Sequence, residues 1–233
     1  MCGIVGVVSN VPVNQLIYDA LLLLQHRGQD AAGIVTQQER KFFMHKAKGM
    51  VRDAFRTRNM RSLPGNCGLG QVRYPTAGNA FSEEEAQPFY VNAPFGIVLV
   101  HNGNLTNAHA LKAELFSADH RHINTESDSE VLLNVLAHEI EATTRGLPLR
   151  PRDVFEAVRK VHLRIKGSYA VIAMIAGHGV LAFRDPFGIR PLCLGRSDDT
   201  WMLASESVAL EGTSHKFDRD IAPGEAVFID LQG

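Results

Sequence analysis

A chain of 233 residues is long enough to bury a hydrophobic core, either as one large domain or as two small ones. A hydrophobic fraction of 45% and a charged fraction of 21% are typical of a soluble globular protein, and we expect a cytoplasmic one. The formal net charge of -1 gives no electrostatic reason to expect nucleic acid or an acidic membrane as a partner, and no apolar run approaches the ~18 residues of a membrane helix.

The N-terminus and the cysteines agree with this expectation. The apolar segment 4–8 has no basic leader and is shorter than the ~7–15 residues of a signal-peptide core, so we interpret it as a buried strand. Cys2, Cys67 and Cys193 are an odd number with no paired spacing, which argues against a disulfide framework. The sequence has no Cys-x-x-Cys pair, which argues against a structural zinc site.

Strand patterns dominate both ends of the chain. Residues 169–177 and 179–185 predict a β-hairpin with a small turn between Gly177 and Gly179. The other predicted strands cover residues 4–9, 33–38, 42–48, 67–73, 96–101, 192–196, 201–205 and 226–230.

Helical periodicity follows the first strand and fills the middle of the chain. Apolar residues at steps of three and four predict a helix over 13–24 and another over 154–165. Ser127 and Glu130 have the spacing of a capping box and precede an apolar stripe over 131–140. A fourth helix is expected to begin near Thr106 or Asn107.

The predicted elements run as strands, helices and strands again, without regular β-α-β alternation. This order favours an α+β fold with largely antiparallel sheets and segregated helices over a doubly wound parallel sheet. No repeat and no convincing domain boundary is visible, so residues 1–233 are expected to form one domain.

Cys2 is the first candidate for chemistry. Its small side chain permits removal of Met1, which would leave a cysteine with a free α-amino group. A thiol has a pKa of ~8.5 and an α-amino group one of ~7.7–8.0, so this one residue would supply both a nucleophile and its general base. By position alone, Cys2 is more simply explained as a small apolar residue at the head of a strand.

The segment 101–104 directly follows a predicted apolar strand. Attack on an amide carbonyl creates an oxyanion that needs hydrogen-bond donors fixed in advance. The side-chain amide of Asn102 and the backbone N–H of Gly103 would supply two such donors. Asn-Gly is also the commonest tight-hairpin dipeptide, so this segment taken alone predicts a turn.

Two further segments carry charges that suit an amino-acid ligand. Arg73 presents a rigid fork of donors for an α-carboxylate, and Thr76 would add a hydroxyl contact. Asp128 would lie in the first turn of a helix capped by Ser127, where the helix dipole favours an ionised carboxylate that could hold an α-ammonium group. Taken singly, each also has an ordinary explanation, as a surface arginine at a strand end and an acid at a helix start.

Together these segments resemble the glutaminase domain of class II glutamine amidotransferases, a branch of the N-terminal nucleophile hydrolases. Chance agreement of five spaced motifs is remote, so the resemblance outweighs the separate structural explanations. The matching strings are residues 1–6, 26–33, 72–78, 101–105 and 127–130, in family order over essentially the whole chain.

Variants of these motifs resemble one branch of the class, whose full-length enzymes use the ammonia on phosphoribosyl pyrophosphate in the first step of purine biosynthesis. The glucosamine-6-phosphate synthase branch would carry Trp-Ala-Thr-His after the arginine, whereas residues 74–77 here read Tyr-Pro-Thr-Ala. The strings that look like the purine branch are residues 25–30, 73–78, 86–90 and 182–192.

The resemblance implies a fold and a catalytic centre. The fold would be a four-layer α-β-β-α sandwich of two antiparallel sheets, in agreement with the predicted element order. Cys2 would be the nucleophile, and its α-amine the proton acceptor and later the proton donor. Asn102 and Gly103 would form the oxyanion hole.

The same resemblance implies a glutamine-binding pocket. Arg73, with help from Thr76, would bind the α-carboxylate of glutamine, and Asp128 would bind its α-amino group. Arg27 and Gly28 belong to a motif that lines this pocket. No metal or cofactor is expected in this domain.

The resemblance also implies a second half of the enzyme. Its fingerprint, a hydrophobic strand that ends in two acidic residues before a small-residue loop, does not occur in these 233 residues. We therefore expect residues 1–233 to be the glutaminase half, with the C-terminal phosphoribosyltransferase domain and its Mg²⁺ absent. The expected partners are glutamine and, through the second half, phosphoribosyl pyrophosphate, and the full enzyme is expected to be a homo-oligomer.

Three alternatives remain open. The chain would serve equally as the glutaminase domain of another class II amidotransferase, because the acceptor half decides the product. It would be a non-catalytic glutamine-binding module if Met1 stays on and Arg73 and Asp128 only bind. A metal site at His120 and His122 is the third, although a single His-x-His in a charged loop is better explained by solvated histidines.

Overall fold

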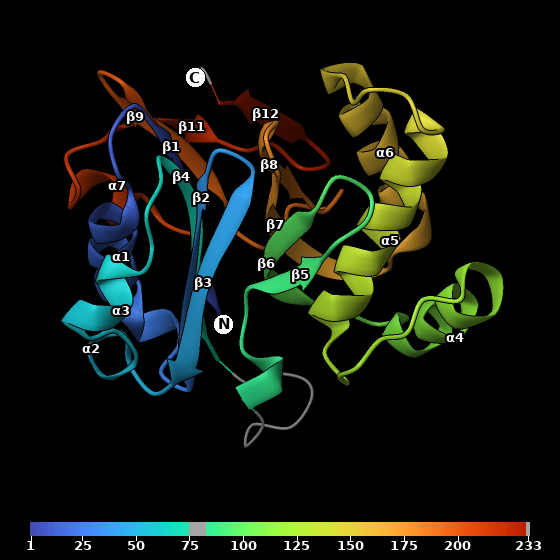
Figure 1. Ribbon diagram of the computed structural model, residues 1–233, viewed down its shortest axis with the longest axis horizontal. Coiled ribbons are helices and arrows are strands. Elements are labelled where there is room, and N and C mark those ends of the chain that lie inside the picture. The colour runs from blue at the N-terminus through green and yellow to red at the C-terminus, as the bar shows by residue number, and fades with distance from the viewer. Residues whose placement is uncertain (75–82, 232–233) are drawn as a thin grey trace.

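The structure is a computed structural model that describes residues 1–74 and 83–231. Two β-sheets lie face to face between two layers of helices (Figure 1). Helices α1, α2, α3 and α7 cover the outer face of one sheet, and α4, α5 and α6 lie on the outer side of the other. The predicted four-layer α-β-β-α sandwich of the α+β class is confirmed. No helix in the described ranges is long and apolar enough to cross a membrane.

Every strand pair within the two sheets is antiparallel, as predicted. Over the described residues, the larger sheet has the order β11(Lys216–Asp220), β9(Cys193–Ser197), β10(Thr200–Ala204), β1(Gly3–Ser9), β4(Cys67–Arg73), β2(Ala31–Gln38) and β3(Lys41–Lys48). The smaller sheet has the order β12(Ala226–Asp230), β8(Gly179–Arg184), β7(Gly167–Ile175), β6(Ile97–Leu105) and β5(Phe89–Val91).

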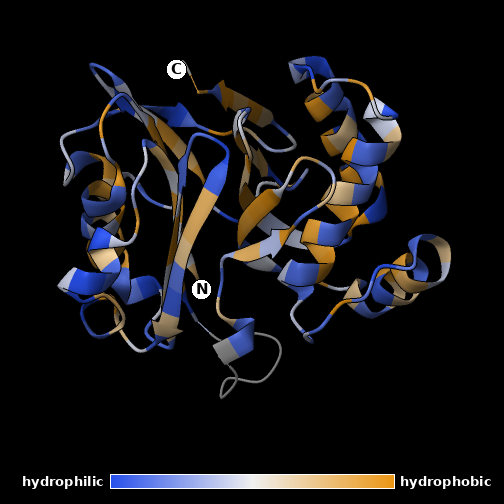
Figure 2. Cartoon of the chain, viewed as in Figure 1, coloured by the Kyte–Doolittle hydropathy of each residue, from blue (hydrophilic) through white to orange (hydrophobic). Residues whose placement is uncertain are grey.

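The helices that periodicity predicted, now α1, α4, α5 and α6, lie close to their expected positions. The longest pack on the sheets through their apolar stripes, which Figure 2 shows in orange against polar outer faces. Their bounds are α1(Asn14–Leu23), α2(Val51–Ala54), α3(Thr57–Arg61), α4(Ala108–Asp119), α5(Asp128–Thr144), α6(Pro151–Arg164) and α7(Ser207–Glu211), with short 3-10 helices η1(Gln25–Arg27) and η2(Glu83–Glu85).

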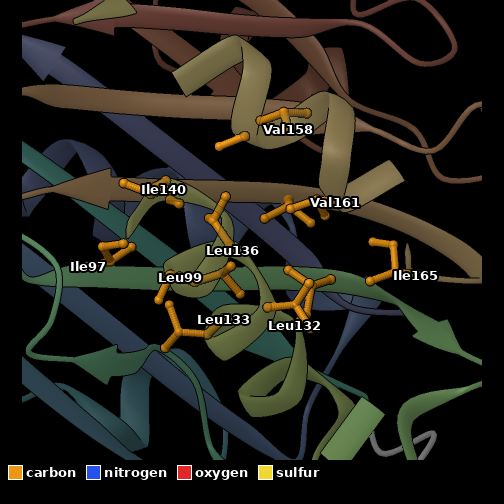
Figure 3. Packing of buried hydrophobic residues seen from close by; sticks show 14 of the residues in the cluster. Ile97, Leu99, Leu132, Leu133, Leu136, Ile140, Val158, Val161 and Ile165 are labelled. Carbon is orange, nitrogen blue, oxygen red and sulfur yellow. The ribbon is translucent and has the colours of Figure 1, made fainter. Parts of the chain in front are cut away.

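Three buried clusters correspond to the three spaces between the four layers. One fills the space between α1 and the larger sheet, and a second fills the space between the two sheets. The third lies between the smaller sheet and the long helices, where β6 meets α5 and α6 (Figure 3). Its labelled members are Ile97, Leu99, Leu132, Leu133, Leu136, Ile140, Val158, Val161 and Ile165.

The central strand β1 is buried on both faces, because the sheet is covered on one side by helices and on the other by the second sheet. Val5 and Val7 face the helices, while Ile4 and Val8 face the smaller sheet. Side chains alternate along a strand, so Cys2 has the same parity as Ile4 and faces the space between the sheets.

The strand predicted over 96–101 was too short. In the structure, β6 continues to Leu105, and Asn102 and Gly103 pair with Ala170 and Tyr169 of β7. The interpretation of Asn102-Gly103 as a tight hairpin turn is therefore wrong. The predicted hairpin over 169–185 is confirmed, since β7 and β8 pair directly around Gly177.

The predicted capping box at the start of α5 is half right. Ser127 is the N-cap residue, and its hydroxyl accepts a hydrogen bond from the backbone N–H of Ser129 at 3.4 Å. The carboxylate of Glu130, however, accepts from the backbone N–H groups of Asn124 and Thr125 at 3.1 and 2.8 Å. Glu130 therefore fastens the preceding loop to the helix instead of completing the box with Ser127.

Candidate active site

Cys2 lies at the head of the central strand, where its side chain is 7% exposed. The backbone N–H of Tyr74 donates to its sulfur at 3.5 Å, and the sulfur lies 3.6 Å from the carbonyl oxygen of Tyr74. Figure 1 shows the N-terminus at one end of the sandwich, between the two sheets. The thiol is thus held at the edge of the inter-sheet layer by the backbone that follows β4.

Strand alternation brings the predicted catalytic and carboxylate-binding residues into this same layer. Arg73 shares its face of β4 with Leu69, and Asn102 shares its face of β6 with Val98 and Val100. Leu69, Val98 and Val100 all belong to the cluster between the sheets. Cys2, Arg73 and Asn102, taken from three separate strands, therefore face one space.

Asn102 is 1% exposed, and its side-chain nitrogen Nδ2 has no hydrogen-bond partner within residues 1–74 and 83–231. A buried N–H without a partner costs free energy, so such groups are few in folded proteins. The neighbouring Gly103 lines the cavity beside Cys2. A Cβ atom there would lie 2.0 Å from the carbonyl oxygen of Ser168 and 2.6 Å from Nε2 of His101, so only glycine fits.

Arg73 is engaged by carboxylates of its own chain. Its guanidinium donates to Asp30 at 2.9 Å and to Glu85 at 2.8 Å. Both the arginine and Glu85 are buried. The site therefore already holds a carboxylate against the guanidinium that was predicted to bind the α-carboxylate of glutamine.

Asp128, the first residue of α5, belongs to a buried polar cluster beside Cys2. Its carboxylate accepts from the backbone N–H of Leu105 at 2.8 Å and from the Ser129 hydroxyl at 3.3 Å. The same Ser129 hydroxyl lies 2.9 Å from Nδ1 of His101 and accepts from the Gln87 amide at 2.8 Å. These bonds fix the position of the predicted ammonium-binding carboxylate.

Arg27 and Gly28 contact the main chain of Cys2 and of Arg73, respectively. The Nε of Arg27 donates to the carbonyl oxygen of Cys2 at 2.9 Å, and its guanidinium forms an ion pair with Glu206. Gly28 packs on the main chain of Arg73, where a Cβ atom would lie 2.5 Å from the carbonyl carbon. These two residues hold Cys2 and Arg73 in place, and in this structure neither lines the cavity itself.

The cavity beside Cys2 has a volume of about 20 Å³, which suits a single water molecule better than an amino acid. It is lined by Cys2, Arg73, Tyr74, Gln87, His101, Gly103, Ser127, Asp128 and Ser129. Thr76, the predicted helper of Arg73, lies outside the described residues.

Burial has opposite effects on the Cys2 thiol and on the α-amino group of Met1. It raises the pKa of the Cys2 thiol, against the opposing effects of the Tyr74 N–H and the N-terminal and Arg73 charges. It lowers the pKa of the chain's α-amino group, which Met1 carries here.

Sequence reasoning gave no role to four residues that shape this site: Asp30, Glu85, Gln87 and Ser129. Asp30 and Ser129 lie inside strings that matched the family, so position was the only signal. Glu85 and Gln87 lie just before β5, a strand that was not predicted, although Gln87 belongs to the matching string 86–90. In the part of the chain that the structure describes, no three metal-ligating side chains are close enough together to hold an ion. This holds for the neighbourhood of His120 and His122 as well.

This sandwich, with a cysteine at the head of its central strand, has the N-terminal nucleophile hydrolase fold. A family model described as a glutamine amidotransferase domain matches residues 79–212, more than half of the chain, so the chain belongs to the glutamine amidotransferase domain family. The matched range begins after Cys2 and Arg73. The family model therefore says nothing about these two residues, and their proposed roles are supported by their positions in the structure.

The relatives are amidophosphoribosyltransferases. Those of Pasteurella multocida and Escherichia coli are 57% and 56% identical over 238 and 239 residues, which include all of this chain. Each match covers 47% of the relative, so the chain spans about half the length of the curated relatives it matches. A solved Bacillus subtilis glutamine phosphoribosylpyrophosphate amidotransferase, in complex with ADP and GMP, matches the whole chain and 48% of its own, with a TM-score of 0.85 at 30% identity.

Proposed function

We propose that this chain is the glutaminase half of an amidophosphoribosyltransferase and that it hydrolyses glutamine through a thioester on Cys2. One observation supports this proposal above the others. The buried thiol of Cys2 faces the inter-sheet layer at the end where Asn102 keeps a buried N–H without a partner in the described chain. A nucleophile beside a donor that is free to meet an oxyanion is the arrangement that acyl transfer needs.

The first half of the reaction would form the thioester. Once Met1 is removed, the α-amine of Cys2 takes the proton of its own thiol, and the thiolate attacks the side-chain carbonyl carbon of glutamine. The carbonyl oxygen becomes an oxyanion, stabilised by the Asn102 amide and the Gly103 N–H. The α-ammonium group returns its proton to the leaving nitrogen, the C–N bond breaks, and ammonia departs.

The second half would release glutamate. The same amine takes a proton from water, and the resulting hydroxide attacks the thioester carbon. The oxyanion forms again at the same donors, the C–S bond breaks, and the sulfur recovers its proton from the ammonium group. One water is consumed, and glutamate and ammonia are the two products.

Glutamine would be bound through the two charged groups on its α-carbon. Asp128 would hold the α-ammonium group, and Arg73 the α-carboxylate, with Thr76 expected to help. Arg73 has Asp30 and Glu85 as acceptors, so the substrate carboxylate must share the guanidinium with them or displace one.

We extend the proposal to the full-length enzyme through the relatives' names. The ammonia would pass to phosphoribosyl pyrophosphate in a second domain and give 5-phosphoribosylamine, the first step of purine biosynthesis. The Mg²⁺ of that domain, the homo-oligomer and the cytoplasmic location belong to this part of the proposal. A different acceptor domain would make the chain part of another class II amidotransferase.

The proposal is tested with protein from which Met1 has been removed. It should convert glutamine to equal amounts of glutamate and ammonia, and a glutamine-like electrophile should add its mass to Cys2. Cys2→Ala should abolish both, whereas Cys193→Ser should keep them, because a hydroxyl can replace the bond from that buried thiol to Ala204. Absence of both ammonia and adduct would refute the proposal.

Intact mass distinguishes this proposal from a glutamine-binding module without catalysis. Catalysis requires loss of Met1, whereas binding through Arg73 and Asp128 does not. A purified protein that keeps Met1, binds glutamine and releases no glutamate would support the binding module.

A further inference from the structure

Gln71 is a buried polar side chain that the mechanism above does not use. It lies in β4 two residues before Arg73, on the face that looks into the inter-sheet layer, and it is 1% exposed. Its partner on β1 is Ile4, which has the same parity as Cys2. Gln71 therefore lies one step of strand alternation further into the molecule than the nucleophile and the arginine.

The direction of the Gln71 amide is fixed by its neighbour on the facing sheet. Its Nε2 donates to the carbonyl oxygen of His101 at 3.2 Å. A carbonyl oxygen can only accept, so the nitrogen end of the amide must face it and Oε1 must point away. Over residues 1–74 and 83–231, this buried Oε1 has no hydrogen-bond partner.

The unpaired side-chain atoms of Gln71 and Asn102 have complementary hydrogen-bonding roles. Gln71, whose Nε2 is bonded to the His101 carbonyl, offers a free acceptor in Oε1, and Asn102, the next residue of β6, offers a free donor in Nδ2. A primary carboxamide needs both, because its oxygen accepts and its NH₂ group donates. Burying either group without a partner is costly, so both are expected to meet a ligand in the working site.

We propose that Gln71 recognises the amide nitrogen of glutamine. Its Oε1 accepts a hydrogen bond from the substrate NH₂ group, while Asn102 and Gly103 face the amide oxygen. This inference rests on the proposed glutaminase function and deepens it. Glutamate has a carboxylate with no hydrogen to donate, so it would set a negative oxygen against Oε1, and the same residue disfavours the product.

The depth of Gln71 agrees with this assignment. Arg73 and Asp128, which would hold the α-carbon end of glutamine, come from the last residue of β4 and the first residue of α5. The side-chain amide of the substrate must then point into the layer, past Cys2, which is level with Arg73. Gln71 lies one step of strand alternation deeper on the same strand as Arg73, where the terminal NH₂ group of that amide would lie.

The test compares two substrates that give the same thioester. Glutamine loses ammonia, while the γ-methyl ester of glutamate loses methanol and carries no N–H at that position. In Met1-free protein, Gln71→Met should lower kcat/KM for glutamine about tenfold or more, the effect of one lost buried hydrogen bond. It should leave kcat/KM for the ester within about threefold, so the amide-to-ester ratio is the readout.

Gln37 supplies a matched control. It is 3% exposed on β2, and its Oε1 accepts from the backbone N–H of Gly177 in the facing sheet at 3.2 Å. It pairs with Cys67, at the opposite end of the sheet from Arg73. Gln37→Met thus removes a buried bridge between the sheets away from the nucleophile, and the amide-to-ester ratio should stay at the wild-type value.

A second variant covers the case in which Gln71→Met does not fold. Gln71→Asn keeps a polar amide but shortens the side chain by one carbon, so its oxygen no longer reaches the substrate and the ratio should also fall. If both folded variants slow the two substrates equally, Gln71 is only a bridge between the sheets and the inference is wrong. If wild-type protein cleaves neither substrate, the proposed function itself fails.

Discussion

Glu85 is placed where it would compete with a substrate. Its carboxylate is buried against the Arg73 guanidinium, whereas the second partner, Asp30, is more exposed. The guanidinium has five N–H donors in a fixed fork, so each carboxylate already bound occupies positions that the α-carboxylate of glutamine would use. Glu85 therefore has the chemistry of an internal substitute for that carboxylate.

Glu85→Gln should consequently lower KM for glutamine, by about tenfold if one charge-assisted hydrogen bond is freed. The measurement is steady-state ammonia release by Met1-free protein. Glu84→Gln is the matched control, because that neighbour is exposed and should leave KM unchanged. A rise in KM for Glu85→Gln would mean that Glu85 orients Arg73 for the substrate instead of competing with it.

At this scale, a family resemblance was needed before the sequence singled out site residues. A thiol next to a removable Met1 and an Asn-Gly pair after a strand each have an ordinary structural explanation, and only their agreement with spaced family motifs made Cys2 and Asn102 candidates. Glu85 was not a candidate, because Glu occurs in any exposed loop, and Gln87 was matched only as one member of the string 86–90. Only the packing of this loop against Arg73 and Ser129 makes them part of the site.

Among the elements, β6 shows how local preference yields to tertiary structure. Asn102-Gly103 has the composition of a tight turn, yet it continues a strand through five positions paired with β7, from His101 to Leu105. The crowded neighbours of Gly103 explain why glycine is needed there without a turn. Strand β6 thus carries both predicted oxyanion donors on a rigid element.

Helix α5 delivers Asp128 to the site, so its first turn should affect both stability and binding. Ser127→Ala removes the side-chain acceptor for the Ser129 N–H, and loss of such a cap costs about 1 kcal/mol. We expect that decrease in the free energy of unfolding, measured with urea, together with a higher KM for glutamine.

Ser117→Ala is the control for this prediction. The Ser117 hydroxyl is exposed and only donates back to the carbonyl oxygen of Glu114 within α4. Its loss should change neither the free energy of unfolding nor KM appreciably. A normal KM in Ser127→Ala would show that Asp128 is held sufficiently by Leu105 and Ser129.

The elements that sequence reasoning missed are short or lack a buried face. Strand β11 is exposed along its whole length and so shows no alternation of polar and apolar residues. Strand β5 has three residues, and α2 and α3 have four and five, which is too short for a periodic pattern. Long elements with one buried face were predicted because burial imposes a period on the sequence.

In the molecule as a whole, the inter-sheet layer changes character along its length. Most of it is the apolar cluster that holds the two sheets together. At the Cys2 end, polar side chains replace the apolar ones, with Gln71, Arg73 and Asn102 all buried. Two antiparallel sheets thus place polar groups from different strands at one end of a dry layer, where hydrogen bonds are strong.

Burial of histidines in several layers makes the stability of the whole molecule depend on pH. Desolvation by burial lowers the pKa of His101, His162 and His215 below the ordinary value of 6.5. A histidine with a lowered pKa binds its proton more readily when the chain is unfolded. Its stabilising effect is therefore complete above pH 6.5 and is lost as the pH falls below that value.

We therefore expect the free energy of unfolding to decrease as the pH falls from 6.5 to 5.5, measured by urea unfolding at each pH. His162→Gln should make this decrease shallower, because a glutamine can keep the bond to the Tyr169 hydroxyl, now 2.7 Å from Nδ1, without titrating. The exposed His109, changed to Gln, should leave the pH dependence as it is. If the decrease is equally steep in both variants and the wild type, burial of His162 contributes nothing to it, and the acid sensitivity must come from the other buried histidines or from the carboxylates.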